Sequence, residues 1–455
     1  MRTQAACAVA MVLIAGFGTA CEGDATDPGA EPTGASGESV ELEFLAYGAD
    51  DEVAAYESMV QRFNDDNPGV EVRLETAANQ DEARRVLASG DVPDVFLASR
   101  RDLVGIAEAG INQPLDELLD SRGVDFGDLY KRDALLAFSL DSRLQCMPYG
   151  ASPMVMYYNT DLVDFEEMAA QELPVSGNPL RWNFDQFAAA AEFAARRGTK
   201  GVHIDPTLQG LAPFVYSGGG ELFDDPRQPT TLTLTDEATQ GALGRTMQLL
   251  RRGRITLSPR QLRQESALRR FKDGRLGMIA GFRGLVPELR EVEGLSFDVM
   301  PMPVLESETT VGDVSGICLA ADSASTSAAA DFVVHAISAE SVAEVTEAGY
   351  LVPASNEVAE SEAFLQRDRL PAHAEVFNRS VRDIVIPPLL ESLPALEKAV
   401  HDDLYRLFYA RVIAIDEIAA AIDEASRVVI DPEAAAEQDA EQDSESGETP
   451  TDESS

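Results

Sequence analysis

The sequence predicts an α/β fold in which sheets are covered by helices. Residues 40–99 alternate segments of strand and helix periodicity with short links, an order typical of a parallel sheet flanked by helices. Between the low-complexity ends lie roughly 390 residues, enough for two ordinary domains. We therefore expect two α/β units rather than one.

The amino-terminal residues 1–20 have the pattern of a signal peptide. Arg2 precedes an apolar run of about thirteen residues, too short to span a bilayer, and small residues then lead up to Cys21. A cysteine at this place is typical of a lipobox, the lipid acceptor of exported bacterial lipoproteins, although Gly18 stands where a larger aliphatic residue is common. We predict a lipid anchor at Cys21 on the outer face of the cell membrane. A secreted protein with a free Cys21 is the alternative.

Residues 21–39 and 432–455 are predicted to be a disordered tether and a disordered acidic tail. Both are rich in small or acidic residues and poor in apolar ones, so they cannot bury a core. The net charge of −43 argues against nucleic acid as a partner, because phosphate binding needs a basic patch.

The first half of the folded part alternates strand and helix patterns. Strands are expected at residues 40–48, 70–77 and 92–99. Helices are expected at residues 50–66, 81–90 and 103–119, the last broken at Gly110 and Pro114. Asp50 or Asp51 is the expected cap of the first helix.

The second half carries longer helical patterns. Helices are expected from a cap at Asn183 to Gly198, from Thr235 to about residue 253, and as a pair over residues 394–429. Strands are expected after the turn at Asp273-Gly274, at residues 297–303 and at residues 314–320. Tyr157 and Tyr158 alternate sides of another apolar strand, so one of them should be core, and Trp182 is expected to be structural.

The sequence shows no constellation typical of catalysis. Its four histidines are scattered without metal-ligand spacing, and no serine stands in a nucleophile-elbow motif. Cys146 and Cys318 also fit no zinc motif. We therefore predict no enzymatic activity, no cofactor and no metal. A secreted carbohydrate-active hydrolase is the alternative.

Eight motifs follow one another in a recognisable order: "YESMVQRFNDDNPGVEV", "GDVPDVFLAS", "AGINQPLDELL", "MPYGASPMVMYYNTDLV", "RWNFDQF", "GGGELFDD", "FKDGRLGMIAGFRG" and "AGYLVPASNEVAES". With them, the chain resembles the extracellular solute-binding proteins of the sugar type (family 1), which are maltose-binding-protein-like, lipid-anchored receptors of ABC importers. The resemblance covers about residues 40–430.

The resemblance implies a two-lobed periplasmic-binding-protein type II fold, with mixed sheets flanked by helices and a central cleft between hinge-linked lobes. Lobe 1 would contain residues 40–149 and 312–350, and lobe 2 residues 150–311 and 351–431. The segment "MPYGASP" would cross between them, and hinge bending would close the cleft. The implied function is that of a monomer that delivers a mono- or oligosaccharide to ABC permease subunits. Receptors for another polar solute (sugar phosphate, polyol or acidic sugar) and an extracytoplasmic sensor subunit are the alternatives.

The same resemblance implies which residues line the cleft. The expected ligand-binding residues are Tyr47, Ser99, Arg100, Tyr149, Phe282, Arg283, Ser315 and Gly316. In the "GFRG" loop, Phe282 would stack on the solute where the family often has tryptophan, and Arg283 would pair with an anionic solute. The lack of an aromatic residue in "ESLPALEKAV" argues against long maltodextrins. Cys146 and Cys318 lie near two crossings and could form a disulfide; two separate buried thiols are the alternative.

Overall fold

The structure is a computed structural model that describes residues 39–127, 129–388, 390, 392–433 and 435. The predicted signal peptide, Cys21, nearly all of the tether and most of the acidic tail lie outside these residues. No helix among the described residues is long and apolar enough to cross a membrane.

The first of two large sheets is mixed. Its strand order is β13-β7-β12-β3-β1-β2, with β4 and β14 pairing at β12. The strands are β1 (Val40–Tyr47), β2 (Val70–Ala77), β3 (Val95–Ser99), β4 (Asn112–Gln113), β7 (Met147–Pro153), β12 (Thr310–Ala320), β13 (Val352–Pro353) and β14 (Ile384–Val385). Strand β1 is parallel to β2 and β3, whereas β12 is antiparallel to β3 and β7.

Helices cover this sheet because each carries one apolar face. They include α1 (Asp50–Asp66), α2 (Gln80–Leu87), α13 (Thr326–Ala336) and α14 (Ala339–Glu347). In α1 the buried side chains Tyr56, Met59, Val60 and Phe63 recur at helical spacing. Phe63 packs edge-on against Phe332 of α13, with ring centroids 5.2 Å apart. Asp50 and Asp51 lie inside the first turn of α1 and do not cap it; the helix is preceded by Ala49, and the two carboxylates favour the positive end of the helix dipole.

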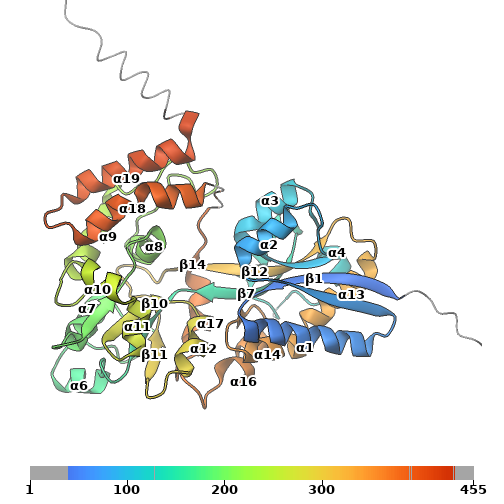
Figure 1. The fold of residues 1–455 in the computed structure, drawn as a ribbon, viewed down its shortest axis with the longest axis horizontal. Coiled ribbons are helices and arrows are strands. Elements are labelled where there is room, and N and C mark those ends of the chain that lie inside the picture. Colours follow the sequence, from blue (N-terminus) through green and yellow to red (C-terminus); the bar gives the residue numbers. More distant parts are fainter. Residues whose placement is uncertain (1–38, 128, 389, 391, 434, 436–455) are drawn as a thin grey trace, which may run out of the picture. The chain divides into compact units, whose positions relative to one another are not determined.

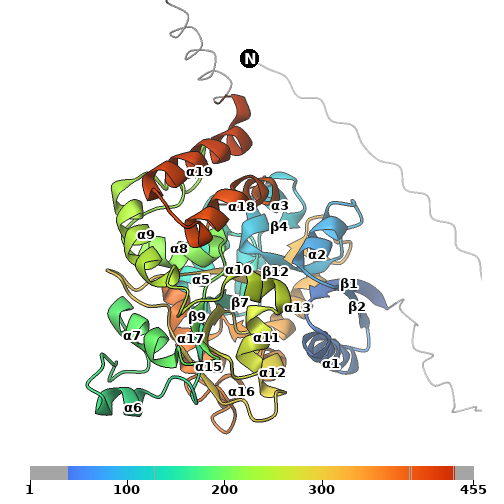
Figure 2. The same ribbon diagram turned by 60° about the vertical axis from the view of Figure 1, so that its left-hand side comes forward.

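The second sheet has the strand order β11-β8-β10-β9. These strands are β8 (Val155–Asn159), β9 (Lys200–His203), β10 (Leu276–Gly281) and β11 (Phe297–Met300). Helices of this part of the chain include α7 (Phe184–Ala194), α8 (Leu208–Ser217), α9 (Glu237–Leu250), α11 (Ala267–Lys272) and α12 (Leu285–Arg290). Helices α18 (Leu393–Tyr409) and α19 (Ile415–Ile430) pack against each other and against α9 (Figure 2).

Both faces of the second sheet are buried. Met156 and Tyr158 of β8 belong to one hydrophobic core, whereas Val155 and Tyr157 belong to the other. The expectation that only one of the two tyrosines is core was therefore wrong, because side chains that alternate on a strand enter opposite cores when helices cover both faces. Trp182 is buried, and its indole N–H donates to the carbonyl of Pro301 at 2.8 Å, as a structural residue would.

Other expected boundaries shift for local reasons. Helix α9 begins at Glu237 rather than Thr235, because the Asp236 carboxylate accepts hydrogen bonds from the N–H groups of Ala238 and Thr239. Helix α7 has the expected cap at Asn183, as part of a capping box with Gln186, but it ends at Ala194. The break expected within residues 103–119 is confirmed: α3 (Leu103–Glu108) and α4 (Asp116–Asp120) are separate helices, with Gly110 at a positive φ between them.

Three segments far apart in the sequence lie side by side where the two sheets join. Strand β7 pairs with β12 from Pro153 opposite Gly312 to Met147 opposite Ile317, and β13 pairs with the other edge of β7. A single residue, Met154, separates β7 of the first sheet from β8 of the second. The segment "MPYGASP" thus runs directly from one sheet into the other (Figure 1).

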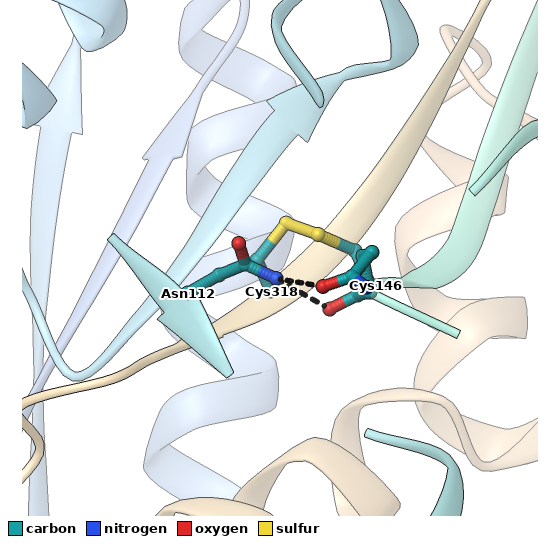
Figure 3. The surroundings of a disulfide bond; sticks show 4 residues. Asn112, Cys146 and Cys318 are labelled. Carbon is teal, nitrogen blue, oxygen red and sulfur yellow. Dashed lines mark hydrogen bonds between the residues drawn. A yellow bond between two sulfur atoms is a disulfide. The ribbon is translucent and has the colours of Figure 1, made fainter. Parts of the chain in front are cut away.

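A disulfide joins these segments inside the first sheet. Cys146 precedes β7 and Cys318 lies in β12; the two form the bond, and both are fully buried. Figure 3 shows the side-chain amide of Asn112 next to it, donating to the backbone and side-chain oxygens of Gln145 at 3.0 and 3.2 Å. The bond joins two of the three adjacent segments, β7 and β12, at their ends inside the first sheet.

Candidate ligand-binding site

A cavity of about 400 Å³ lies where the two sheets meet. Its volume falls in the range of about 300–1,000 Å³ that small-molecule sites have. Its walls are formed by Tyr47, Gly48, Glu52, Tyr56, Gln80, Leu97, Arg101, Ala151, Ser152, Gln209, Phe282, Gly284, Gly312, Asp313, Ser315, Tyr350 and Leu351. A second cavity of about 450 Å³ shares Gln209, Phe282 and Gly284 with it and extends over the second sheet.

The first-sheet wall is formed by segments that follow parallel strands. Tyr47 ends β1, Glu52 lies in the first turn of α1, and Arg101 follows β3. Because the carboxyl ends of parallel strands lie at the same edge of a sheet, these three side chains reach one cavity. Ligand sites of open α/β sheets are found at that edge.

The floor of the cavity is formed by the strands that connect the sheets. Asp313 of β12 accepts a hydrogen bond from the hydroxyl of Ser99 at 2.6 Å and another from the backbone N–H of Val314 at 2.8 Å. Burial raises the pKa of Asp313, while the Ser99 hydrogen bond and the charge of Arg101 oppose that shift. Asp313 is therefore a buried carboxylate that the protein itself largely compensates.

Glu52, in contrast, has few groups nearby that stabilise its negative charge. Its carboxylate folds back over Gly48, so that a Cβ at that glycine would collide with it. Burial raises the pKa of Glu52 to about 7, and only the backbone N–H of Ala49 opposes the shift. The absence of a Cβ at Gly48 leaves room for the Glu52 carboxylate in this position, whereas a side chain there would push the carboxylate aside.

The second-sheet wall is less charged. It contributes Phe282 and Gly284 from the loop between β10 and α12, and Gln209 from the first turn of α8. The hydroxyl of Tyr157 donates to the backbone carbonyl of Phe282 at 2.6 Å, which holds the loop against β8. Phe282 is only partly buried, so its ring is available to a ligand.

The structure brings three of the eight predicted residues to this cavity. Tyr47, Phe282 and Ser315 line it. Ser99 lies behind the wall and is hydrogen-bonded to Asp313, and the neighbour of Arg100, Arg101, takes its place at the surface of the cavity. Whether any of them contacts a solute remains a prediction.

The other predicted residues lie away from the cavity. The side chain of Tyr149 is buried against Tyr56, with ring centroids 6.1 Å apart, and its hydroxyl has no partner among the described residues. At Gly316, a Cβ would meet the ring of Phe138, which fills the space on that side of β12. These two positions pack inside the first core.

Arg283 is fully buried rather than exposed to the cavity. Its guanidinium lies 4.2 Å from the ring centroid of Phe364 and 5.4 Å from that of Phe377, and it donates to the carbonyl of Phe364 at 2.9 Å. Burial lowers its pKa to about 9. The rings of Phe364 and Phe377 form an aromatic slot that holds the guanidinium inside the core, away from the cavity.

Sequence reasoning overlooked several residues of the wall, among them Glu52, Gln80, Arg101, Gln209, Asp313 and Tyr350. Glu52 and Arg101 follow strands that were recognised, so their position after a strand end was an available signal. Tyr350 lies in a loop and Gln209 in the first turn of α8, and only the folded chain shows that both reach the cavity.

Comparison with known proteins gives a consistent result. A sequence profile described as bacterial extracellular solute-binding protein matches residues 58–372. An ABC substrate-binding protein of Listeria monocytogenes in complex with cycloalternan is 20% identical, with a TM-score of 0.70 over 86% of this chain and 99% of that chain. The GacH receptor of Streptomyces glaucescens, studied unliganded and with acarbose, is 20% identical, with a TM-score of 0.67 over 86% and 98%. The cyclic α-maltosyl-1,6-maltose binding protein of Arthrobacter globiformis is 18% identical, with a TM-score of 0.68 over 87% and 100%. These similarities confirm the predicted two-lobed α/β fold.

Proposed function

The chain belongs to the bacterial extracellular solute-binding proteins, and from this premise we propose that it is the sugar-binding subunit of an ABC importer. The family binds solutes, in agreement with the prediction of a receptor rather than an enzyme. The observation that carries the sugar assignment is the cavity itself. It combines aromatic faces, on which sugar C–H groups stack, with carboxylate, amide and guanidinium groups that bond hydroxyls.

The relatives support this ligand class. Structures with the same fold include complexes with cycloalternan, acarbose and maltotriose. The cavity of this chain continues into the second one beyond Phe282, which leaves room for a solute larger than a single sugar ring. We therefore infer that the solute is a mono- or oligosaccharide, captured between the two lobes.

Hinge closure is the proposed mechanism of capture. The lobe with the first sheet would supply Tyr47 and Glu52, and the lobe with the second sheet would supply Phe282; β13 and β14, which were expected in the second lobe, pair with strands of the first sheet. A solute that contacts both lobes stabilises the closed form by its differential affinity for that form. The three adjacent segments that join the sheets are the place where bending would occur.

Anchoring through Cys21 is the proposed location on the cell. The acidic, soluble lobes would then stand outside the membrane beside the permease, held by the tether. Membrane fractionation tests this: the chain should be in the membrane fraction, and Cys21→Ser should release it into the medium. A wild-type chain found entirely in the medium would contradict the anchor.

Thermal unfolding of the purified mature chain with a panel of mono- and oligosaccharides tests the sugar assignment. Binding to the native state alone raises the melting temperature by mass action. We expect a concentration-dependent rise with at least one sugar. A panel without any such rise would overturn the assignment. Loss of sugar uptake after deletion of the gene would distinguish an importer subunit from a sensor.

A further inference from the structure

The cavity contains two carboxylates that differ in how their charge is balanced. Asp313 has the Ser99 hydroxyl, the Val314 N–H and the nearby charge of Arg101. For Glu52, no ion pair with a lysine, arginine or histidine occurs within the described part of the chain. A buried carboxylate without a positive partner is costly, so such a group is usually retained for a ligand.

The surroundings of Glu52 are aromatic. Its negative charge acts on Tyr47, Tyr56, Tyr149 and Tyr350, and contributes to the raised pKa of each hydroxyl. Tyr47, Tyr56 and Tyr350 also line the cavity. Aromatic faces around a carboxylate form the chemical environment that binds organic cations, because the rings and the negative charge both attract them.

The charge balance of the walls favours the same ligand. The wall residues include two carboxylates, Glu52 and Asp313, and one cation, Arg101, which lies on the side of Asp313. Further charged groups close to the tyrosines are mostly acidic: Asp50 and Asp51 in α1, Asp102 paired with Arg84, Glu291 after α12, and Glu344 paired with Arg62. A single positive charge near Glu52 would balance the cavity.

We propose that Glu52 is a specificity-determining residue that binds a protonated amine, so that the preferred solute is an amino sugar or another amine-bearing polyol. This rests on the proposed function, because it assigns a chemical class to the solute of the same cavity. The ammonium group would donate to the Glu52 carboxylate and lie against the tyrosine rings. A neutral sugar would leave that carboxylate with hydroxyl donors only.

Binding of such a cation is linked to the ionisation of Glu52. A cation favours the carboxylate, so below the pKa of about 7 a proton must leave when the solute binds, and affinity falls by up to about tenfold per pH unit. Between this pKa and the pKa of the amine, the carboxylate is ionised, the amine keeps its proton and affinity is independent of pH. A neutral sugar is expected to show no such fall.

Calorimetric titration with matched pairs of probes tests the proposal. The pairs are 6-amino-6-deoxyglucose with glucose, glucosamine with N-acetylglucosamine, and N-methylglucamine with sorbitol. At about pH 8, we expect the wild-type chain to bind at least one amine more tightly than its neutral partner by about tenfold or more. Glu52→Gln should abolish that preference. Asp51→Asn, which removes an exposed carboxylate one residue away, should preserve it.

The outcomes distinguish the amine preference at Glu52 from the sugar-receptor function. Neutral sugars that bind as tightly as their amines, or a preference that persists in Glu52→Gln, would overturn the amine proposal and leave the sugar receptor intact. Failure of every probe and of the oligosaccharide panel would overturn both. Circular dichroism of Glu52→Gln checks that the variant is folded.

Discussion

The two walls of the cavity differ in where they keep their charge. The first-sheet wall presents Glu52 and Arg101 to the cavity beside three tyrosines. The second-sheet wall presents the ring of Phe282, and its nearest cation, Arg283, is buried behind that ring between Phe364 and Phe377. From this difference we infer that the charged groups of the first-sheet wall determine which solute binds, and that the second-sheet wall covers the bound solute.

The comparison also separates residues that act on ligands from residues that hold the fold. Glu52 is partly buried and Arg283 fully buried, and neither has an opposite charge in contact among the described residues. Only Glu52 is on the wall. We therefore expect substitutions at Glu52 to change ligand binding, and substitutions at Arg283 to change stability.

The largest effect is expected from the disulfide that fixes the first-sheet side of the hinge. Replacing both Cys146 and Cys318 with Ala should lower the free energy of unfolding by about 2–5 kcal/mol, because the bond closes a long loop with a sequence separation of 172 residues. Chemical denaturation measures the loss. Mass spectrometry of the alkylated wild-type chain is the control: two reactive thiols without reductant would contradict the bond.

The second effect concerns the buried side of the second wall. Arg283→Ala should lower the free energy of unfolding by about 2–4 kcal/mol, since it removes a buried side chain, its hydrogen bond to Phe364 and its ring contacts. Arg283→Met keeps most of the volume without the charge and should cost less. Equal stability of Arg283→Ala and the wild type would refute this structural role. An exposed control is Arg269→Ala.

The third expected effect is a gain in stability, on replacement of Glu52. The pKa of Glu52 is raised from 4.5 to about 7 in the folded chain, so the native state holds its proton more tightly than the unfolded state. Stability from this group is present below about pH 4.5 and is lost as pH rises to about 7. Glu52→Gln should therefore stabilise the chain at about pH 8 by about 2 kcal/mol, reduced from the full shift because Glu52 is partly exposed. No gain in melting temperature at that pH, relative to Asp51→Asn, would count against the uncompensated charge.

The smallest expected effect is on affinity alone. Phe282→Ala should weaken binding of the best sugar by about 1–3 kcal/mol without lowering the melting temperature of the free chain by more than a few degrees. Calorimetry measures the affinity. A matched control is Phe193→Ala, which removes a partly buried ring from α7, away from the cavity. Equal affinity in both variants would remove Phe282 from the site.

The parts of the fold that could be predicted from the sequence are those with local sequence signals. The strand and helix order of residues 40–99 was correct because apolar periodicity and the Asn67-Pro68-Gly69 stop are local signals. The crossing of "MPYGASP" between sheets was predicted from the family resemblance. Boundaries such as the start of α9 failed by a few residues, since the Thr235 hydroxyl and the Asp236 carboxylate are both good caps and only the folded chain shows which of them bonds the helix.

The site was predicted less well than the fold. The family resemblance led to Tyr47 and Phe282, which line the cavity; their contact with a solute stays a prediction. The inward position of Arg283 depends on an aromatic slot formed by Phe364, which is 81 residues further along the chain, and by Phe377 beyond it. The role of Gly48 in making room for Glu52 is a matter of side-chain direction, which periodicity does not define.

The most direct test of the account compares the two walls with one ligand. Calorimetric titration of the best-binding solute should give a lower affinity for both Glu52→Gln and Phe282→Ala than for the wild type, by about tenfold each. This result would place the solute between the first-sheet and second-sheet walls. Unchanged affinity in both folded variants would contradict the account, because the solute would then bind somewhere other than this cavity.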